Sequence, residues 1–169
     1  RLNSLGKGPY IGVSWKSLNM SPSRLPSYAP ISEWYPIFSL PDVTFINLQY
    51  KDFEDDLIKI KNELGVTVHN FDDLDHFDNL LDVAALSAAL DIVVSVKNTV
   101  PIISAGTGTL TKLVTWRQSP WNNILFNPAG PLVDIFERNT WEPWSNVFSL
   151  IAEDILKLKI KTNNLKDIF

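Results

Sequence analysis

The sequence predicts an α/β fold: a Rossmann-like, doubly wound domain built on a mainly parallel, six-stranded sheet. Two observations predict it. Short apolar runs rich in β-branched residues alternate with amphipathic helical segments, as in strand–helix–strand units. Because parallel crossovers are right-handed, few topologies remain, and the doubly wound order is the most common. With 169 residues, 45% of them hydrophobic, the chain fits one globular domain.

The expected elements follow from local apolar patterns in chain order. Strands are expected at residues 10–15, 43–49, 66–71, 91–96, 112–116 and 133–137. Helices are expected at residues 33–40, 52–64, 83–90, about 100–106 and 145–159. The second of these helices carries acids early and lysines late, and Gly65 ends it. Residues 1–9 are expected to be a linker and residues 160–169 a frayed tail. Because the chain opens with Arg1 rather than Met, we expect a fragment of a longer protein.

The segment 72–108 is the best candidate for a functional site. The strand at 91–96 runs directly into Lys97, Asn98 and Thr99, and Pro101 suits the first turn of the helix that follows. Free amides and the positive end of the helix dipole would then meet at one spot, where phosphate binds readily. Lys16 and Ser17, directly after the first strand, could grip the same phosphate group. We therefore expect a phosphate-bearing ligand at the carboxyl ends of these strands.

Several classes of function are disfavoured by composition and by missing motifs. The net charge of −4 and pI near 5.1 argue against nucleic acid and anionic membranes as partners. No apolar run is long enough for a membrane span. The absence of cysteine excludes thiolate metal sites and disulfides and is compatible with a cytoplasmic location. No strand is followed by a GxGxxG or GxxxxGK[ST] motif, so an ordinary dinucleotide or P-loop site is not expected.

The remaining polar and aromatic clusters have ordinary structural interpretations. The acids at 72–82 do not fit the calcium-loop spacing, and we expect them to be solvated and to cap the helix that begins near Asp82. His69 and His76 lack metal-ligand spacing, so no metal site is expected; His76, among carboxylates, should hold its proton better than a free histidine. Four tryptophans could stack a base or pack a loop. Packing is favoured for two of them, Trp141 and Trp144; the other two are Trp116 and Trp121.

Longer sequence runs carry a family resemblance. The runs GVSWKSLN, INLQYKD and FDDLDHFDNLLDVAALSAALDIVVSVKNT, with the late SPWN and IFER pattern, resemble the carboxyl-terminal half of TPR-linked bacterial glycosyltransferases. Those enzymes are similar to glycosyltransferase family 9, the heptosyltransferases, and more remotely to the O-linked N-acetylglucosamine transferases. The likeness covers about residues 10–147 and is strongest at 72–99. It implies a GT-B enzyme, with two Rossmann-like domains across a cleft and the nucleotide sugar held mostly by the second.

The resemblance also implies roles for individual residues. Lys16 would meet the diphosphate, the backbone around Phe71 and Asp72 would border the nucleoside, and the amides at Asn98 and Thr99 would cap the phosphates. The full candidate set for binding the donor is Lys16, Ser17, Gln49, Phe71, Asp72, Lys97, Asn98 and Thr99. Two positions depart from the family pattern. Lys97 stands where relatives have an acid, and Ile102 stands where they have histidine.

The first hypothesis is therefore the donor-binding half of an inverting, metal-independent glycosyltransferase. It would bind a UDP- or GDP-linked sugar without a further cofactor, and a fixed cation with a helix dipole would stabilise the departing diphosphate. An upstream domain of the same chain, with a second Rossmann-like half and TPR repeats, would supply the acceptor side and the base. The catalytic residues and the acceptor are unknown from the sequence. The alternatives are a non-catalytic interaction module derived from such an enzyme and, more weakly, a nucleotide-sugar epimerase.

Overall fold

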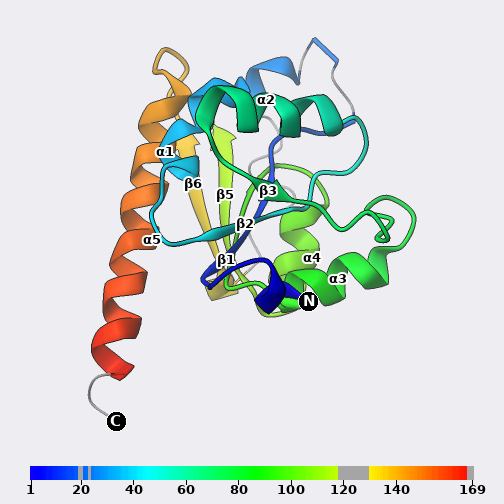
Figure 1. Cartoon of the computed structure of the whole chain (residues 1–169). Helices are drawn as coiled ribbons and strands as arrows, with labels where there is room; N and C mark the ends of the chain where they lie inside the picture. The colour runs from blue at the N-terminus through cyan, green and yellow to red at the C-terminus, as the bar shows by residue number, and fades with distance from the viewer. Residues whose placement is uncertain (19–20, 23, 118–129, 167–169) are drawn as a thin grey trace.

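A computed structural model of the chain describes all residues except 19–20, 23, 118–129 and 167–169. Its centre is a six-stranded sheet in the order β3-β2-β1-β4-β5-β6, and every neighbouring pair is parallel (Figure 1). The strands are β1 (Tyr10–Ser14), β2 (Thr44–Asn47), β3 (Val68–His69), β4 (Ile92–Val96), β5 (Leu110–Trp116) and β6 (Val133–Arg138). This is the doubly wound order, and the predicted fold class is confirmed.

Helices cover both faces of the sheet (Figure 1). The α-helices are α1 (Tyr35–Phe38), α2 (Glu54–Leu64), α3 (Leu80–Ala88), α4 (Val100–Gly106) and α5 (Trp144–Lys166). Short 3-10 helices are η1 (Leu2–Ser4), η2 (Leu25–Ser27), η3 (Ile31–Trp34) and η4 (Gly130–Leu132). Helix α2 ends where predicted, because Gly65 adopts the left-handed conformation (φ 70°) that closes a helix.

The alternation of side chains along each strand divides the core into two layers. One layer joins alternate residues of β1 and β4, such as Ile11 and Val94, to η3, α1, α2 and α5. The other joins Ile46 and Val93 to α3 and the start of α4. Gly12 lies on the second face, where a Cβ atom would approach Leu48 and Leu90 side chains to 2.6 Å. A side chain at this position would therefore force the ends of these two leucines to shift.

The two ends of the chain differ from the sequence-based expectation. Helix α5 continues to Lys166 rather than ending at residue 159, since no glycine or proline interrupts it. Residues 1–9 contain η1 and contact the domain: the Thr44 hydroxyl donates to the Lys7 carbonyl at 2.9 Å. Trp121 and most of the predicted loop 117–131 lie outside the described residues.

Across the part of the chain that the structure describes, no helix combines the length and apolar character needed to cross a membrane.

Candidate functional site

The carboxyl ends of β1, β2 and β4 bring three of the eight predicted site residues together. Because these strands are neighbours in a parallel sheet, the residues that follow them meet at one edge. The Asn98 amide donates from Nδ2 to the Lys16 carbonyl at 3.1 Å and to Ser14 Oγ at 2.9 Å. Gln49 Oε1 accepts from the backbone N–H of Lys16 at 3.0 Å. Lys16, Gln49 and Asn98, from three separate strand ends, therefore form one hydrogen-bonded corner.

Gln49 is the centre of this corner. Its side chain is 1% exposed, and its Oε1 accepts hydrogen bonds from Ser14 Oγ, Trp15 N and Lys16 N at 3.0 to 3.2 Å. Its Nε2 donates to the Tyr50 carbonyl at 3.0 Å. The carboxamide thus takes up the amides at the end of β1 that a phosphate would otherwise bind.

Asn98 does the same at the start of α4. Its Oδ1 accepts from Val100 N at 2.9 Å, Pro101 has no N–H, and the amides of Ile102 and Ile103 bond the Thr99 carbonyl. The amides of Val100, Ile102 and Ile103 at this helix start are therefore paired, whereas the sequence predicted free amides after Thr99. An asparagine two residues before the first amide closes an Asx turn on it, and a seven-residue helix has few other donors to offer.

Lys16 turns from this corner towards α2. Its Nζ donates to Asp56 Oδ2 and to the Asp52 carbonyl, each at 2.6 Å. The same Asp56 oxygen accepts from Trp15 Nε1 at 2.8 Å. The Lys16 and Asp56 side chains are 26% and 25% exposed, so water reaches both members of the ion pair.

A small cavity opens beside Lys16. Its volume is about 140 Å³, and its walls include Lys16, Ser17, Gln49, Lys51 and Asp52. Tyr50 OH donates to Ser17 Oγ at 3.3 Å, which fixes one wall. Lys51 and Asp52 adopt positive φ angles of 53° and 50°, a conformation that costs energy for residues with a side chain. Two lysines, the Ser17 hydroxyl and a strained loop therefore surround this small cavity at the edge of the sheet.

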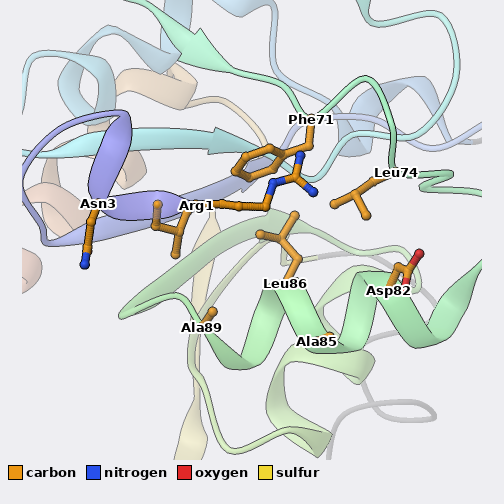
Figure 2. Close-up of a pocket in the computed structure, with 9 residues that line it drawn as sticks. Arg1, Asn3, Phe71, Leu74, Asp82, Ala85, Leu86 and Ala89 are labelled. Atoms are coloured by element: carbon orange, nitrogen blue, oxygen red, sulfur yellow. The ribbon is translucent and has the colours of Figure 1, made fainter.

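The other predicted residues lie further along the edge. Asp72 lines a cavity of about 540 Å³ between the start of α2 and the β3–α3 loop. Phe71 faces a different cavity of about 410 Å³, where the Arg1 guanidinium lies 4.4 Å from the centre of its ring (Figure 2). Leu86 of α3 and Ala89, the residue after that helix, form the opposite wall of that cavity (Figure 2). Phe71 and Asp72, although adjacent in sequence, thus border separate spaces.

Lys97 and Thr99 complete the predicted set. Lys97 follows β4, and burial lowers its pKa to about 8, although the Glu137 carboxylate opposes the shift. Thr99 is exposed and contributes its backbone carbonyl to the first turn of α4. A lysine with a pKa near 8 carries a neutral fraction at physiological pH, which an ordinary lysine does not.

His76 differs from its sequence-based prediction. Its side chain is buried, and both ring nitrogens lack a hydrogen-bond partner. Burial lowers the His76 pKa, and the charge of Asp75 only partly opposes this effect. The prediction that nearby carboxylates would hold its proton is wrong, because Asp75 instead accepts from the backbone amides of Phe77 and Asp78.

Two further expectations need correction. Helix α3 starts at Leu80, earlier than predicted, because Asn79 caps it: Asn79 Oδ1 accepts from Asp82 N, and Asn79 Nδ2 donates to Asp82 Oδ2 at 2.6 Å. Trp144 is buried as expected, but Trp141 is 95% exposed and packs on nothing in the described chain. The sequence around Trp141 gives no sign of this difference, since both tryptophans flank the same Glu-Pro pair.

Within the described residues, no group of three or more acids and histidines is arranged to hold a metal ion.

The chain is similar to a curated protein and to a solved structure. No protein-family profile matches the chain. It is 35% identical over 148 residues to Protein FlbA of Caulobacter vibrioides; the match covers 85% of this chain and 25% of FlbA, so the chain spans about a quarter of that relative's length. The structure of E. coli heptosyltransferase WaaC with ADP-2-deoxy-2-fluoro heptose superposes with a TM-score of 0.60 at 16% identity, covering 92% of this chain and 44% of WaaC. The chain therefore has the fold of a Rossmann-like portion of a GT-B glycosyltransferase.

Proposed function

We propose that this chain is the donor-binding domain of a GT-B glycosyltransferase and binds a nucleoside-diphosphate sugar at the carboxyl edge of its sheet. The observation that carries the proposal is Lys16, placed after β1 with its ammonium beside a cavity and within reach of water. The shared fold with a heptosyltransferase whose structure contains an ADP-sugar analogue supports it. In open α/β sheets, this edge is where ligands bind.

The charges at the edge suit a diphosphate. Lys16 and Lys51 both line the small cavity, and the Lys51 ammonium lies 3.5 Å from the centre of the Phe77 ring. A fixed ammonium at Lys16 stabilises the negative charge that develops on the departing nucleoside diphosphate, so no metal is required of this domain. The nucleoside would extend towards the larger cavity at Asp72. Lys97, next to the start of α4, adds a positive charge further along the edge.

The rest of the enzyme would lie in other parts of a longer cytoplasmic protein. An upstream Rossmann-like half, preceded by TPR repeats, would bring the acceptor and the general base. The short share of FlbA that this chain matches is consistent with such an arrangement. On this proposal the domain binds the donor alone and does not turn over by itself.

Titration of the chain with UDP, GDP and ADP by calorimetry tests the proposal. At least one nucleotide should bind, and Lys16→Ala should weaken it by about 5- to 150-fold, the equivalent of losing a charged hydrogen bond of about 1–3 kcal/mol. Lys59→Ala, at an exposed position of α2, is the matched control and should leave binding unchanged. If none of the three nucleotides binds, the proposal fails.

A second function, a non-catalytic interaction module, is favoured by one observation. Gln49 and Asn98 occupy the amides that a phosphate would use, and Ile102 exposes 48% of its surface where the family has histidine. On this reading the corner is a structural clamp. The same titrations separate the two functions, since the module would bind none of the nucleotides.

A further inference from the structure

We infer that Asp56 is a built-in competitor for the anionic ligand, so that its ion pair with Lys16 lowers the affinity of this edge for phosphate groups. The inference rests on the proposed function. It concerns a residue that the sequence analysis did not select, on helix α2 rather than at a strand end.

The geometry gives Asp56 the position of a bound anion. Its Oδ2 lies 2.6 Å from Lys16 Nζ, and the same ammonium donates to the Asp52 carbonyl, also at 2.6 Å. Asp52 and Lys16 both line the small cavity. The Lys16 ammonium beside the cavity is therefore already paired with Asp56. A phosphate can bind this ammonium strongly only by replacing the Asp56 carboxylate.

Replacement is feasible because Asp56 keeps other partners. Trp15 Nε1 donates to the same Oδ2 at 2.8 Å, and Asp56 stands in the first turn of α2, where the helix dipole favours negative charge. Lys16 has a long flexible stem and a partly exposed head, so its ammonium can turn without unfolding its surroundings. The carboxylate is thus not left without partners when the lysine leaves.

The loop beside the pair is also suited to movement. Lys51 and Asp52, whose carbonyl completes the contact to Lys16, hold consecutive left-handed conformations without being glycine. Such backbone strain is stored in the ligand-free arrangement and is lost if the loop relaxes when Lys16 turns to a ligand.

The consequence is a lower affinity for every anion that uses Lys16. A molecule in which Lys16 is paired with Asp56 must break that contact before its ammonium binds a ligand, so the apparent dissociation constants of a diphosphate and a monophosphate rise by the same factor. Removing the Asp56 charge should therefore strengthen the binding of both by a similar factor.

The experiment compares wild type, Asp56→Asn and Asp55→Asn by calorimetry with UDP, GDP, ADP and their monophosphates. Asp55 is exposed in the same turn of α2, so its substitution removes the same helix-dipole charge without touching Lys16. Asp56→Asn should tighten diphosphate binding by about 3- to 30-fold, the range between an exposed ion pair and a charged hydrogen bond. It should tighten monophosphate binding by a similar factor, and Asp55→Asn should change neither by more than about twofold.

The outcomes separate this inference from the proposed function. If the wild type binds a diphosphate and Asp56→Asn binds it equally or more weakly, Asp56 positions Lys16 and the competitor inference is overturned while the proposed function stands. If neither protein binds any nucleotide, both fail. Thermal unfolding of each variant checks its fold. Should Asp56→Asn not fold, Asp56→Ser keeps an acceptor for the Trp15 indole without the charge and serves the same comparison.

Discussion

Two lysines of this domain meet carboxylates in different ways. Lys112, within β5, has a side chain only 2% exposed, and its Nζ lies 2.5 Å from both Asp134 of β6 and Asp154 of α5. Lys16, beyond the end of β1, is 26% exposed and meets one carboxylate, that of Asp56. The first lysine ties an edge strand and a helix to the sheet. The second is held by a contact that water reaches.

The two lysines differ in whether another anion can replace their carboxylate partners. Two carboxylates around a buried ammonium satisfy it and exclude a further anion, so Lys112 serves packing alone. One carboxylate on a half-buried ammonium can be replaced by a stronger anion at little cost. The same pair of residue types therefore gives a structural link in the sheet and, as we propose, a ligand contact at its carboxyl edge.

The largest expected effect is at Lys112. Lys112→Ala should lower the free energy of unfolding by about 3 kcal/mol, because it leaves two carboxylates without their cation and removes a buried stem. Lys112→Met, which keeps the stem, should lose about half as much. Urea denaturation measures both, with Lys59→Ala as the exposed control. If Lys112→Ala matches that control, the buried lysine is not the structural link described.

A smaller effect is expected at Gln49, which anchors the edge beside Lys16. Gln49→Leu should lower the free energy of unfolding by about 2 kcal/mol, since Ser14 and the amides of Trp15 and Lys16 lose their common acceptor inside the protein. Gln49→Glu keeps that acceptor and should lose less. Denaturation curves of the two variants give the comparison. Equal losses would mean that side-chain volume, and not the hydrogen bonds, stabilises the corner.

The fold was predictable because its signals are local and repeated. Apolar runs and amphipathic segments alternate, and the right-handed crossover rule then restricts the topology. Boundaries were less accurate where tertiary contacts decide them. The strand predicted at 66–71 is only Val68–His69, since β3 is an edge strand with a single neighbour to pair with. Helix α5 runs beyond its predicted end because no local stop signal exists.

The site was predictable only in part. The strand-end rule brought Lys16, Gln49 and Asn98 to one corner, as the structure has them. It could not say that their side chains would pair with the amides expected to be free, because both a ligand and an Asx turn use the same residue types. Asp56 was missed for a related reason. Its link to Lys16 spans 40 residues of sequence and leaves no local pattern.

The smallest effect concerns Lys97, the other lysine of the carboxyl edge, and it depends on pH. Burial lowers its pKa to about 8 in the folded chain from the ordinary value of 10.5. Between these pH values the unfolded chain binds more protons than the folded one, so this lysine's contribution to stability rises with pH across that window. Because the side chain is partly exposed, the gain should be at most about 1 kcal/mol.

Lys97→Arg, which stays charged, tests that expectation. The difference in unfolding free energy between wild type and Lys97→Arg should grow in favour of wild type from pH 7.5 to pH 9.5, about 0.5–1 kcal/mol in denaturation curves. Lys59→Arg should show no such trend, since that exposed lysine has no burial to relieve. A difference in unfolding free energy that does not change with pH would mean that the Glu137 carboxylate fully offsets the effect of burial on the Lys97 pKa. The carboxyl edge would then hold Lys97 as a charged partner of the Glu137 carboxylate.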